Sequence, residues 1–269
     1  MSCKTLLGIR FDAVTRRQAL ERLLELARQA REGYLPAQLA VTVNVQILVI
    51  ARHRCRDLLP VINSSPLVVA DGAPLVLLSR LFHPRLPERV AGSDLIYDIV
   101  AAADREGLRI FFFGGEEEST RQAIGEFMRL HPNLQVAGCA SPVVALSPDE
   151  AQIKEEATMC SRIMEARTDI LLVGLGCPKQ ELFVHRNAER LRGLAAIGLG
   201  GSFNFVSGRV RRAPRWVQRI GMEWFYRIVQ EPRRLFLRYF FDAFFLAAYT
   251  LAEPLRRWRE DHCPSRNGW

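Results

Sequence analysis

Short apolar segments alternate with longer amphipathic segments along most of the chain. The apolar segments are five to seven residues long, which is typical of buried strands. They lie at residues 5–10, 39–45, 66–70, 108–113, 169–173 and 195–199. Alternating strands and helices with short connections favour an α/β fold, here a doubly wound, mostly parallel, Rossmann-like sheet over residues 1–208.

Amphipathic segments between these strands predict the helices. Their expected ranges are residues 13–32, from 73 onward, 94–106, 116–130, 149–166 and 178–192. Sequence signals mark the beginnings of two of these helices. Asp12 is a predicted cap of the first helix, and Ser147-Pro148-Asp149-Glu150 reads as a capping box.

Polar residues at the ends of two predicted strands are the first candidates for chemistry. Thr42 and Asn44 share one face near the end of the second strand, and Asp71 follows the third. Ligands of open parallel sheets bind beyond the carboxyl ends of the strands, so these side chains are expected at one crevice. Asp71 is either a catalytic carboxylate or the cap of the helix beginning near Ala73.

Glycine-rich turns follow the last two predicted strands. Gly174-x-Gly176 is similar to the start of a dinucleotide fingerprint, but Lys179 stands where the third glycine is required. A tight turn is the alternative interpretation. Gly200-Gly201 follows the last strand, where two glycines let the backbone approach a ligand closely.

The composition allows a large core and places the positive charge in one segment. The chain has 269 residues, 49% hydrophobic and 25% charged, which argues against global disorder. Residues 209–238 contain nine arginines and two glutamates, which is +7 of the chain's net +8. Arginine favours bidentate phosphate binding. The alternative is a solvated helix face.

Aromatic residues accompany and follow this basic stretch. Trp216, Ile220 and Trp224 recur every four positions, which predicts one helix face. Residues 239–249 are aromatic and apolar, but they contain Asp242 and fall short of the about 20 apolar residues of a spanning helix. We expect residues 209–269 to form a helical, membrane-associating appendage on an anionic membrane surface. Packing on the main domain is the alternative.

Cysteine and histidine usage argues against a metal site. The six cysteines form no C-x-x-C pair, the five histidines are scattered, and no D-x-D pair occurs. We therefore expect no metal and no cofactor. Dispersed cysteines also fit a reducing, cytoplasmic compartment.

Several motifs occur together in chain order. They are Thr42-x-Asn44, Asp71-Gly72, residues 87–94, residues 174–181, Gly200-Gly201-Ser202-Phe203, Arg212-Ala213-Pro214, residues 223–227 and residues 230–234. This set resembles the WecG/TagA/CpsF glycosyltransferases over most of residues 39–240. The resemblance implies an inverting, metal-independent transfer from a UDP-sugar to a polyprenyl-diphosphate-linked sugar in bacterial surface or exopolysaccharide biosynthesis. It also implies peripheral binding at the inner face of the cell membrane, and it leaves open whether the protein is a homo-oligomer.

The chemistry of such a transfer gives these residues roles. One base must remove the proton of the acceptor hydroxyl, and Asp71 is the candidate. Without a metal, arginine must stabilise the departing diphosphate. The candidates for that contact are Arg227, Arg234 and Arg238. The predicted substrate-binding residues are Thr42, Asn44, Arg89, Gln180, Gly200, Gly201 and Asn204.

Some of these positions have alternatives. The family commonly has Asp where this chain has Asn204, and it often has the first of two arginines where this chain has Leu237. One contact at each position is therefore in question. Arg89 could instead be a surface arginine paired with Glu88 or Asp94. The start of the next helix is the alternative role of Gln180.

Two other function classes fit parts of the sequence. A nicotinamide-dependent oxidoreductase fits the fold but not the incomplete glycine fingerprint. A phosphate- or nucleic-acid-binding protein fits the basic segment, but the remaining chain is close to neutral and shows no recognised nucleic-acid module. No nucleic acid partner is expected.

Overall fold

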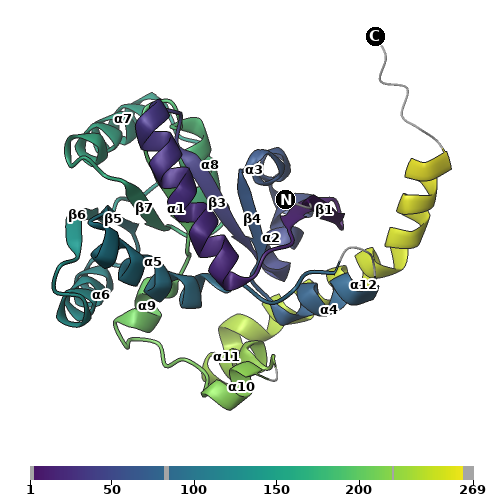
Figure 1. The fold of residues 1–269 in the computed structure, drawn as a ribbon. Helices are drawn as coiled ribbons and strands as arrows, with labels where there is room; N and C mark the ends of the chain where they lie inside the picture. The colour runs from purple at the N-terminus through teal and green to yellow at the C-terminus, as the bar shows by residue number, and fades with distance from the viewer. Residues whose placement is uncertain (1–2, 82–84, 220, 263–269) are drawn as a thin grey trace, which may run out of the picture.

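The structure is a computed structural model that describes residues 3–81, 85–219 and 221–262. At its centre is a six-stranded parallel sheet with the order β4-β3-β8-β7-β5-β6 (Figure 1). The strands are β3 (Gln38–Val43), β4 (Leu67–Ala70), β5 (Arg109–Gly114), β6 (Gln135–Ala140), β7 (Ile170–Gly174) and β8 (Ala195–Gly198). The prediction of a doubly wound, Rossmann-like sheet is confirmed.

Helices cover both faces of this sheet and divide the core into two layers. Alternate strand residues enter each layer, as Ala40 and Val41 do on β3. One layer is covered by α1 (Arg16–Gly33), α5 (Gly92–Glu106), α6 (Glu117–Leu130) and α9 (Ser202–Val206). The other is covered by α2 (Val45–Val49), the π-helix η1 (Ile50–Arg54), α3 (Leu58–Ser64), α4 (Ala73–Leu81), α7 (Glu150–Glu165) and α8 (Lys179–Arg186).

The first predicted strand is instead an antiparallel hairpin, so that prediction is wrong. β1 (Cys3–Leu6) pairs with β2 (Ile9–Asp12). The two residues between them, Leu7 and Gly8, have φ values of 53° and 81°. Positive φ at both positions is the requirement of the tightest hairpin turn, and leucine there gives no sequence signal for it.

Two predicted helix caps are also wrong, by two or three residues. Thr15 rather than Asp12 caps α1, and Asp149 rather than Ser147 caps α7. In both helices a glutamine three residues later completes a capping box. The carboxylate of Asp12 instead accepts a hydrogen bond of 2.8 Å from the backbone of β4. It therefore joins the hairpin to the sheet.

The sequence pattern missed β6 and overextended α8. β6 is an edge strand whose residues are exposed or only half-buried, so it has no continuous apolar run. A Cβ atom at Gly138 would lie 2.8 Å from the ring of Phe111, so the small residue lets β6 pass beside that ring. α8 ends at Arg186 rather than at residue 192.

The C-terminal part consists of α10 (Arg215–Arg219), α11 (Glu223–Gln230) and α12 (Pro232–His262). The predicted single helix face from Trp216 to Trp224 is wrong, because the chain turns at Gly221 with a φ of 75°. Ile220, which belonged to that face, lies outside the described residues. The boundary proposed at residue 208 stays a prediction.

α12 is longer than its aromatic centre suggested. By length and composition alone, Leu235–Ala252 could cross a membrane, with a mean hydropathy of 1.4. The prediction that this segment is too short for a span is therefore wrong on length, because apolar helix continues on both sides of it. The chain of α12 extends away from the sheet in Figure 1.

One side of α12 packs on the domain and the other is open. Tyr249 is hydrogen-bonded to His53 of η1, and the guanidinium of Arg52 lies 4.8 Å from the Tyr249 ring centroid. Asp242 is buried on the packed side. Three phenylalanines on the open side are about half exposed or more: Phe240, Phe241 and Phe244. Packing on the main domain is therefore present, and membrane association of the open side stays a prediction.

Gly174, at the end of β7, is a position where we expect a methyl group to destabilise the fold. An added Cβ would lie 2.7 Å from the ring of Phe203 and 3.2 Å from the carbonyl oxygen of Gly200. Gly174→Ala should therefore lower the free energy of unfolding by about 1–3 kcal/mol in a denaturant titration.

Gly125→Ala is the matched control for this substitution. Gly125 lies inside α6, and its added Cβ would meet nothing within 4 Å in the described part of the chain. It should raise the free energy of unfolding by about 0.4–1 kcal/mol, because alanine restricts the unfolded chain. Equal effects of the two substitutions would contradict the packing at Gly174.

Candidate active site

The carboxyl ends of β3, β4 and β8 meet at one edge of the sheet. The amide of Asp71 donates to the carbonyl oxygen of Val43 at 2.7 Å, which joins β4 to β3. The hydroxyl of Thr42 donates to the carbonyl oxygen of Gly198 at 3.0 Å, which joins β3 to β8. The predicted candidates on these strands are thus neighbours, as the order of elements indicated.

Asp71 is a half-buried carboxylate at this edge. Its Oδ2 accepts a hydrogen bond of 3.2 Å from the amide of Gly92, the first residue of α5. Burial raises the pKa of Asp71 to about 6, although the nearby positive charge of Arg89 opposes this shift. The carboxylate therefore loses its proton just below neutral pH and is a stronger base than an exposed aspartate.

Thr42 and Asn44 each make a contact that maintains the local fold. Thr42 is buried, and a Cβ placed on Gly92 would lie 3.4 Å from its hydroxyl oxygen. β3 ends at Val43, so Asn44 lies beyond the strand and caps α2 by accepting from the amide of Ile47 at 3.0 Å. Sugar binding by either residue stays a prediction.

Gln180 lies beneath the glycine turn rather than in open space. It is 2% exposed, its Oε1 accepts from the amide of Gly200 at 3.1 Å, and its Nε2 donates to Glu181 at 2.7 Å. Its direct substrate contact stays a prediction. In contrast, an added Cβ at Gly176, Gly200 or Gly201 would meet none of the described residues within 4 Å, so a ligand has room to approach the backbone there.

Asn204, on α9, presents an unsatisfied acceptor. Its buried Oδ1 has no hydrogen-bond partner among the residues that the structure describes. Buried polar atoms are nearly always paired, so an unpaired oxygen near the glycine turn fits a site for a ligand or water. The sequence could not reveal this, because it depends on what surrounds the side chain.

A pocket of about 240 Å³ opens at the ends of β5 and β7. Its walls are Gly115, Gly174, Leu175, Lys179 and residues 142–144. The sequence had placed Gly174 and Lys179 at this end of the sheet but had not linked residues 142–144 to them. That loop follows β6, the strand that the apolar pattern missed.

The C-terminal arginines have separate surroundings. The guanidinium of Arg227 lies 5.4 Å from the ring centroid of Phe205 on α9, next to Asn204. Arg238 lies over Tyr239 at 4.9 Å, and its buried Nε has no hydrogen-bond partner in the described part of the chain. The side chain of Arg234 lies outside the described residues. Diphosphate binding by these arginines stays a prediction.

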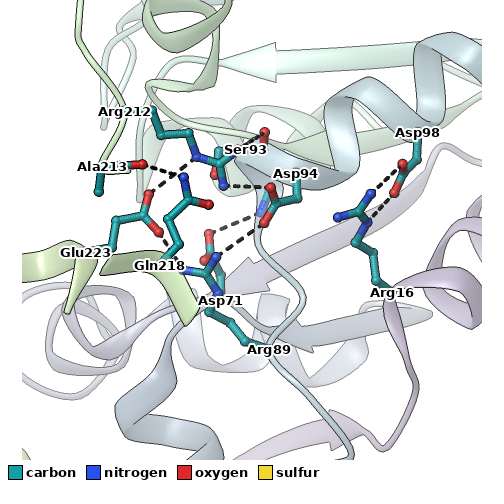
Figure 2. A network of polar contacts seen from close by, with 11 residues as sticks. Arg16, Asp71, Arg89, Ser93, Asp94, Asp98, Arg212, Ala213, Gln218 and Glu223 are labelled. Carbon is teal, nitrogen blue, oxygen red and sulfur yellow. Dashed lines mark hydrogen bonds and ion pairs between the residues drawn. The ribbon is translucent and has the colours of Figure 1, made fainter. Parts of the chain in front are cut away.

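Arg89 belongs to a ring of four charged side chains (Figure 2). Its Nη1 lies 2.6 Å from Glu223 Oε2 and its Nη2 lies 3.2 Å from Asp94 Oδ2. Arg212 closes the ring, with Nη2 2.6 Å from Asp94 Oδ1 and Nε 3.6 Å from Glu223 Oε1. The expected pairing of Arg89 with Asp94 is therefore present, whereas no sequence pattern predicted Glu223 as a second partner. This ring joins α11 to the edge of the sheet that holds Asp71.

The described ranges contain no group of three or more His, Cys, Asp or Glu side chains arranged to hold a metal ion. The predicted lack of a metal requirement is a matter for experiment. The arrangement as a whole offers the Asp71 carboxylate with its raised pKa, an ion-paired arginine, open glycines and further arginines from the C-terminal helices.

Comparisons with known proteins agree with the sequence motifs. The sequence model of the glycosyl transferase WecG/TagA/CpsF family matches residues 4–260. An N-acetylglucosaminyldiphosphoundecaprenol N-acetyl-beta-D-mannosaminyltransferase of Bacillus subtilis (strain 168) is 33% identical over 193 residues, which is 72% of each chain. The protein of the same name from Bacillus spizizenii is 32% identical over 174 residues, 65% of this chain and 64% of that protein. The chain therefore belongs to the WecG/TagA/CpsF family and is a glycosyltransferase.

Proposed function

We propose that this glycosyltransferase moves a sugar from a UDP-sugar to a polyprenyl-diphosphate-linked sugar, with inversion and without a metal, in the synthesis of a bacterial surface polysaccharide. The names of the two relatives described above support an N-acetylhexosamine as the transferred sugar and an N-acetylglucosaminyl diphosphate lipid as the acceptor. The observation that carries the proposal is the carboxylate of Asp71, with a pKa near 6, at the open edge of the sheet.

The proposed reaction is a single displacement. Asp71 removes the proton from the acceptor hydroxyl as that oxygen attacks the anomeric carbon of the donor. The bond between this carbon and the donor diphosphate breaks, so the new bond forms on the opposite face of the sugar. The proton remains on Asp71 and the negative charge leaves with UDP.

The other candidate residues support this step by position and charge. Arg227 and Arg238, with Arg234, supply positive charge for the leaving diphosphate. The glycine turn and Asn204 border the open space in which the donor would bind. The pocket at the ends of β5 and β7 has room for part of the donor, and Lys179 lies in its wall.

The place of action is proposed to be the cytoplasmic face of the membrane. The half-exposed phenylalanines of α12 offer an apolar surface, and the arginines of residues 209–238 attract anionic lipid. A polyprenyl-linked acceptor would be held in the same membrane. Among the described residues, no feature of the site favours the oxidoreductase or nucleic-acid alternatives.

The direct test is a panel of UDP-sugars, including UDP-N-acetylmannosamine, with a lipid-diphosphate N-acetylglucosamine acceptor. UDP should be released only when donor and acceptor are both present, and the product should show the inverted anomeric configuration by NMR. A reaction without acceptor measures hydrolysis. Failure of every donor, by a protein that is folded and bound to vesicles, would refute the proposal.

Activity should survive EDTA, because arginines rather than a metal ion are expected to stabilise the leaving diphosphate. The measurement is UDP release followed by chromatography, so that no metal-dependent coupling enzyme is needed. Added Mg²⁺ or Mn²⁺ serves as the comparison. A strict requirement for either ion would show that the arginines do not supply this charge by themselves.

A further inference from the structure

The ring of Arg89, Asp94, Arg212 and Glu223 is placed to affect the catalytic carboxylate. Its side chains are only 15% to 22% exposed, so water and salt screen their interactions incompletely. Glu223 lies 134 residues after Arg89 in the sequence and reaches it from the first turn of α11. The contact therefore exists only when α11 lies against the domain.

This ring differs in charge from a phosphate site. Two arginines face two carboxylates, so the four side chains have no net charge. Both nitrogens at the end of Arg89 face carboxylates, Nη1 toward Glu223 and Nη2 toward Asp94. A diphosphate would have to displace a carboxylate to bind here, so the ring is better suited to fixing Arg89 than to binding substrate.

We propose, on the basis of the function proposed above, that Glu223 is a positioning residue that acts on Asp71 through Arg89, and that Arg212 holds Glu223 in place. The ion pair with Glu223 orients the guanidinium of Arg89 toward the ring, so that Arg89 does not pair fully with Asp71. Asp71 then keeps a free oxygen for the acceptor hydroxyl. α11 thus contributes to the base without touching the substrate.

The charges around Asp71 are consistent with this arrangement. Arg89 favours its ionised form, whereas Glu223 and Asp94 oppose ionisation and the amide of Gly92 favours it. Removing the charge of Glu223 takes away one negative neighbour and frees Arg89 to pair with Asp71. Both changes lower the pKa of Asp71, which makes it a weaker base.

Glu223→Gln is the test, because glutamine keeps the shape and loses the charge. The acidic limb of the kcat/KM profile should move to lower pH by about half a unit or more. At pH 8 kcat should fall about three- to tenfold, because a weaker base removes the proton less readily. The KM for the donor should change little. Glu223→Asp, which keeps the charge, should restore the position of the acidic limb.

Asp98→Asn is the matched control. Asp98 lies on α5, as Asp94 does, but it pairs with Arg16 at 2.7 Å, outside the ring (Figure 2). This variant should keep the wild-type pH profile. If Glu223→Gln keeps the wild-type profile, or shifts no further than Asp98→Asn, the proposal is wrong.

A measurement without catalysis separates this proposal from the proposed function. The side-chain carboxyl of Asp71 can be titrated by NMR in aspartate-labelled protein, with Asp71→Asn used for assignment. The pH midpoint of the Asp71 titration should be lower in Glu223→Gln than in wild type. This result does not depend on which substrates the enzyme uses. An unchanged midpoint, in a variant with the wild-type melting temperature, would overturn the role of Glu223.

Discussion

Asp71→Asn is expected to reduce kcat for sugar transfer by about 100- to 10,000-fold, the usual effect of losing a general base. Asparagine has nearly the same shape, and its Oδ1 can still accept the hydrogen bond that Gly92 donates at 3.2 Å. The fold should therefore persist, while the proton of the acceptor hydroxyl has no base to take it. Single-turnover UDP release and thermal unfolding measure the two properties separately.

The pH dependence gives a second measure of the same residue. Because burial raises the pKa of Asp71 to about 6, the wild-type kcat/KM should be constant above this value and fall below it. The fall should approach about tenfold per pH unit as the base becomes protonated. The residual activity of Asp71→Asn should lack this limb. If Asp71→Asn turns over at nearly the wild-type rate, Asp71 serves only to bind the start of α5.

Truncation after Ser207 is expected to remove both vesicle binding and most catalysis. It deletes Arg227 and Arg238, and with them charge proposed for the leaving diphosphate, together with two members of the ring, Arg212 and Glu223. It also deletes α12 and its exposed aromatic side. Sedimentation with anionic vesicles and UDP release on a soluble acceptor analogue report the two losses. Unchanged turnover after truncation would show that the segment is only an anchor.

Full-length variants separate the two losses and avoid the risk that the truncated chain misfolds. Arg227→Gln should reduce kcat by about tenfold or more and leave vesicle binding nearly intact, because one charge near the surface contributes only about 1 kcal/mol. Serine at Phe240, Phe241 and Phe244 should do the reverse, since these exposed side chains offer apolar surface to lipid and carry no charge for the diphosphate.

Ile153→Ser is the matched control for the phenylalanine variant. Ile153 is an exposed apolar residue on α7, a helix at the opposite end of the molecule from α12 in Figure 1. It should bind vesicles as wild type does. If it loses binding as strongly as the phenylalanine variant, the vesicles would not be recognising α12.

The sequence predicted the central strands and their ends well because those strands are buried on both sides. A continuous apolar run marked β4 and β5, and the polar residue after β4 located Asp71. The edge strand β6 and the N-terminal hairpin gave no such signal, since exposed or tightly turned segments need no apolar run. The pattern of apolar runs and following polar residues therefore predicted the part of the site that lies at the strand ends.

The rest of the site depends on approach between distant segments. No spacing rule relates Glu223 to Arg89, and their pairing follows from the turn at Gly221 that redirects the chain into α11. The burial of Gln180 beneath Gly200 likewise depends on how α8 packs against β8. Such features require the three-dimensional structure, because they follow from packing rather than from periodicity.

Ionic strength should affect the exposed arginines of the C-terminal part and the shielded ring around Arg89 differently. Attraction between exposed arginines and anionic lipid acts over a distance comparable with the Debye length, about 8 Å at physiological salt and about 3 Å at 1 M. The ring pairs lie at 2.6 to 3.6 Å and are mostly shielded from water, so salt weakens them much less. Concentrated salt should therefore weaken the proposed attraction to an anionic membrane while α11 keeps its place beside Asp71.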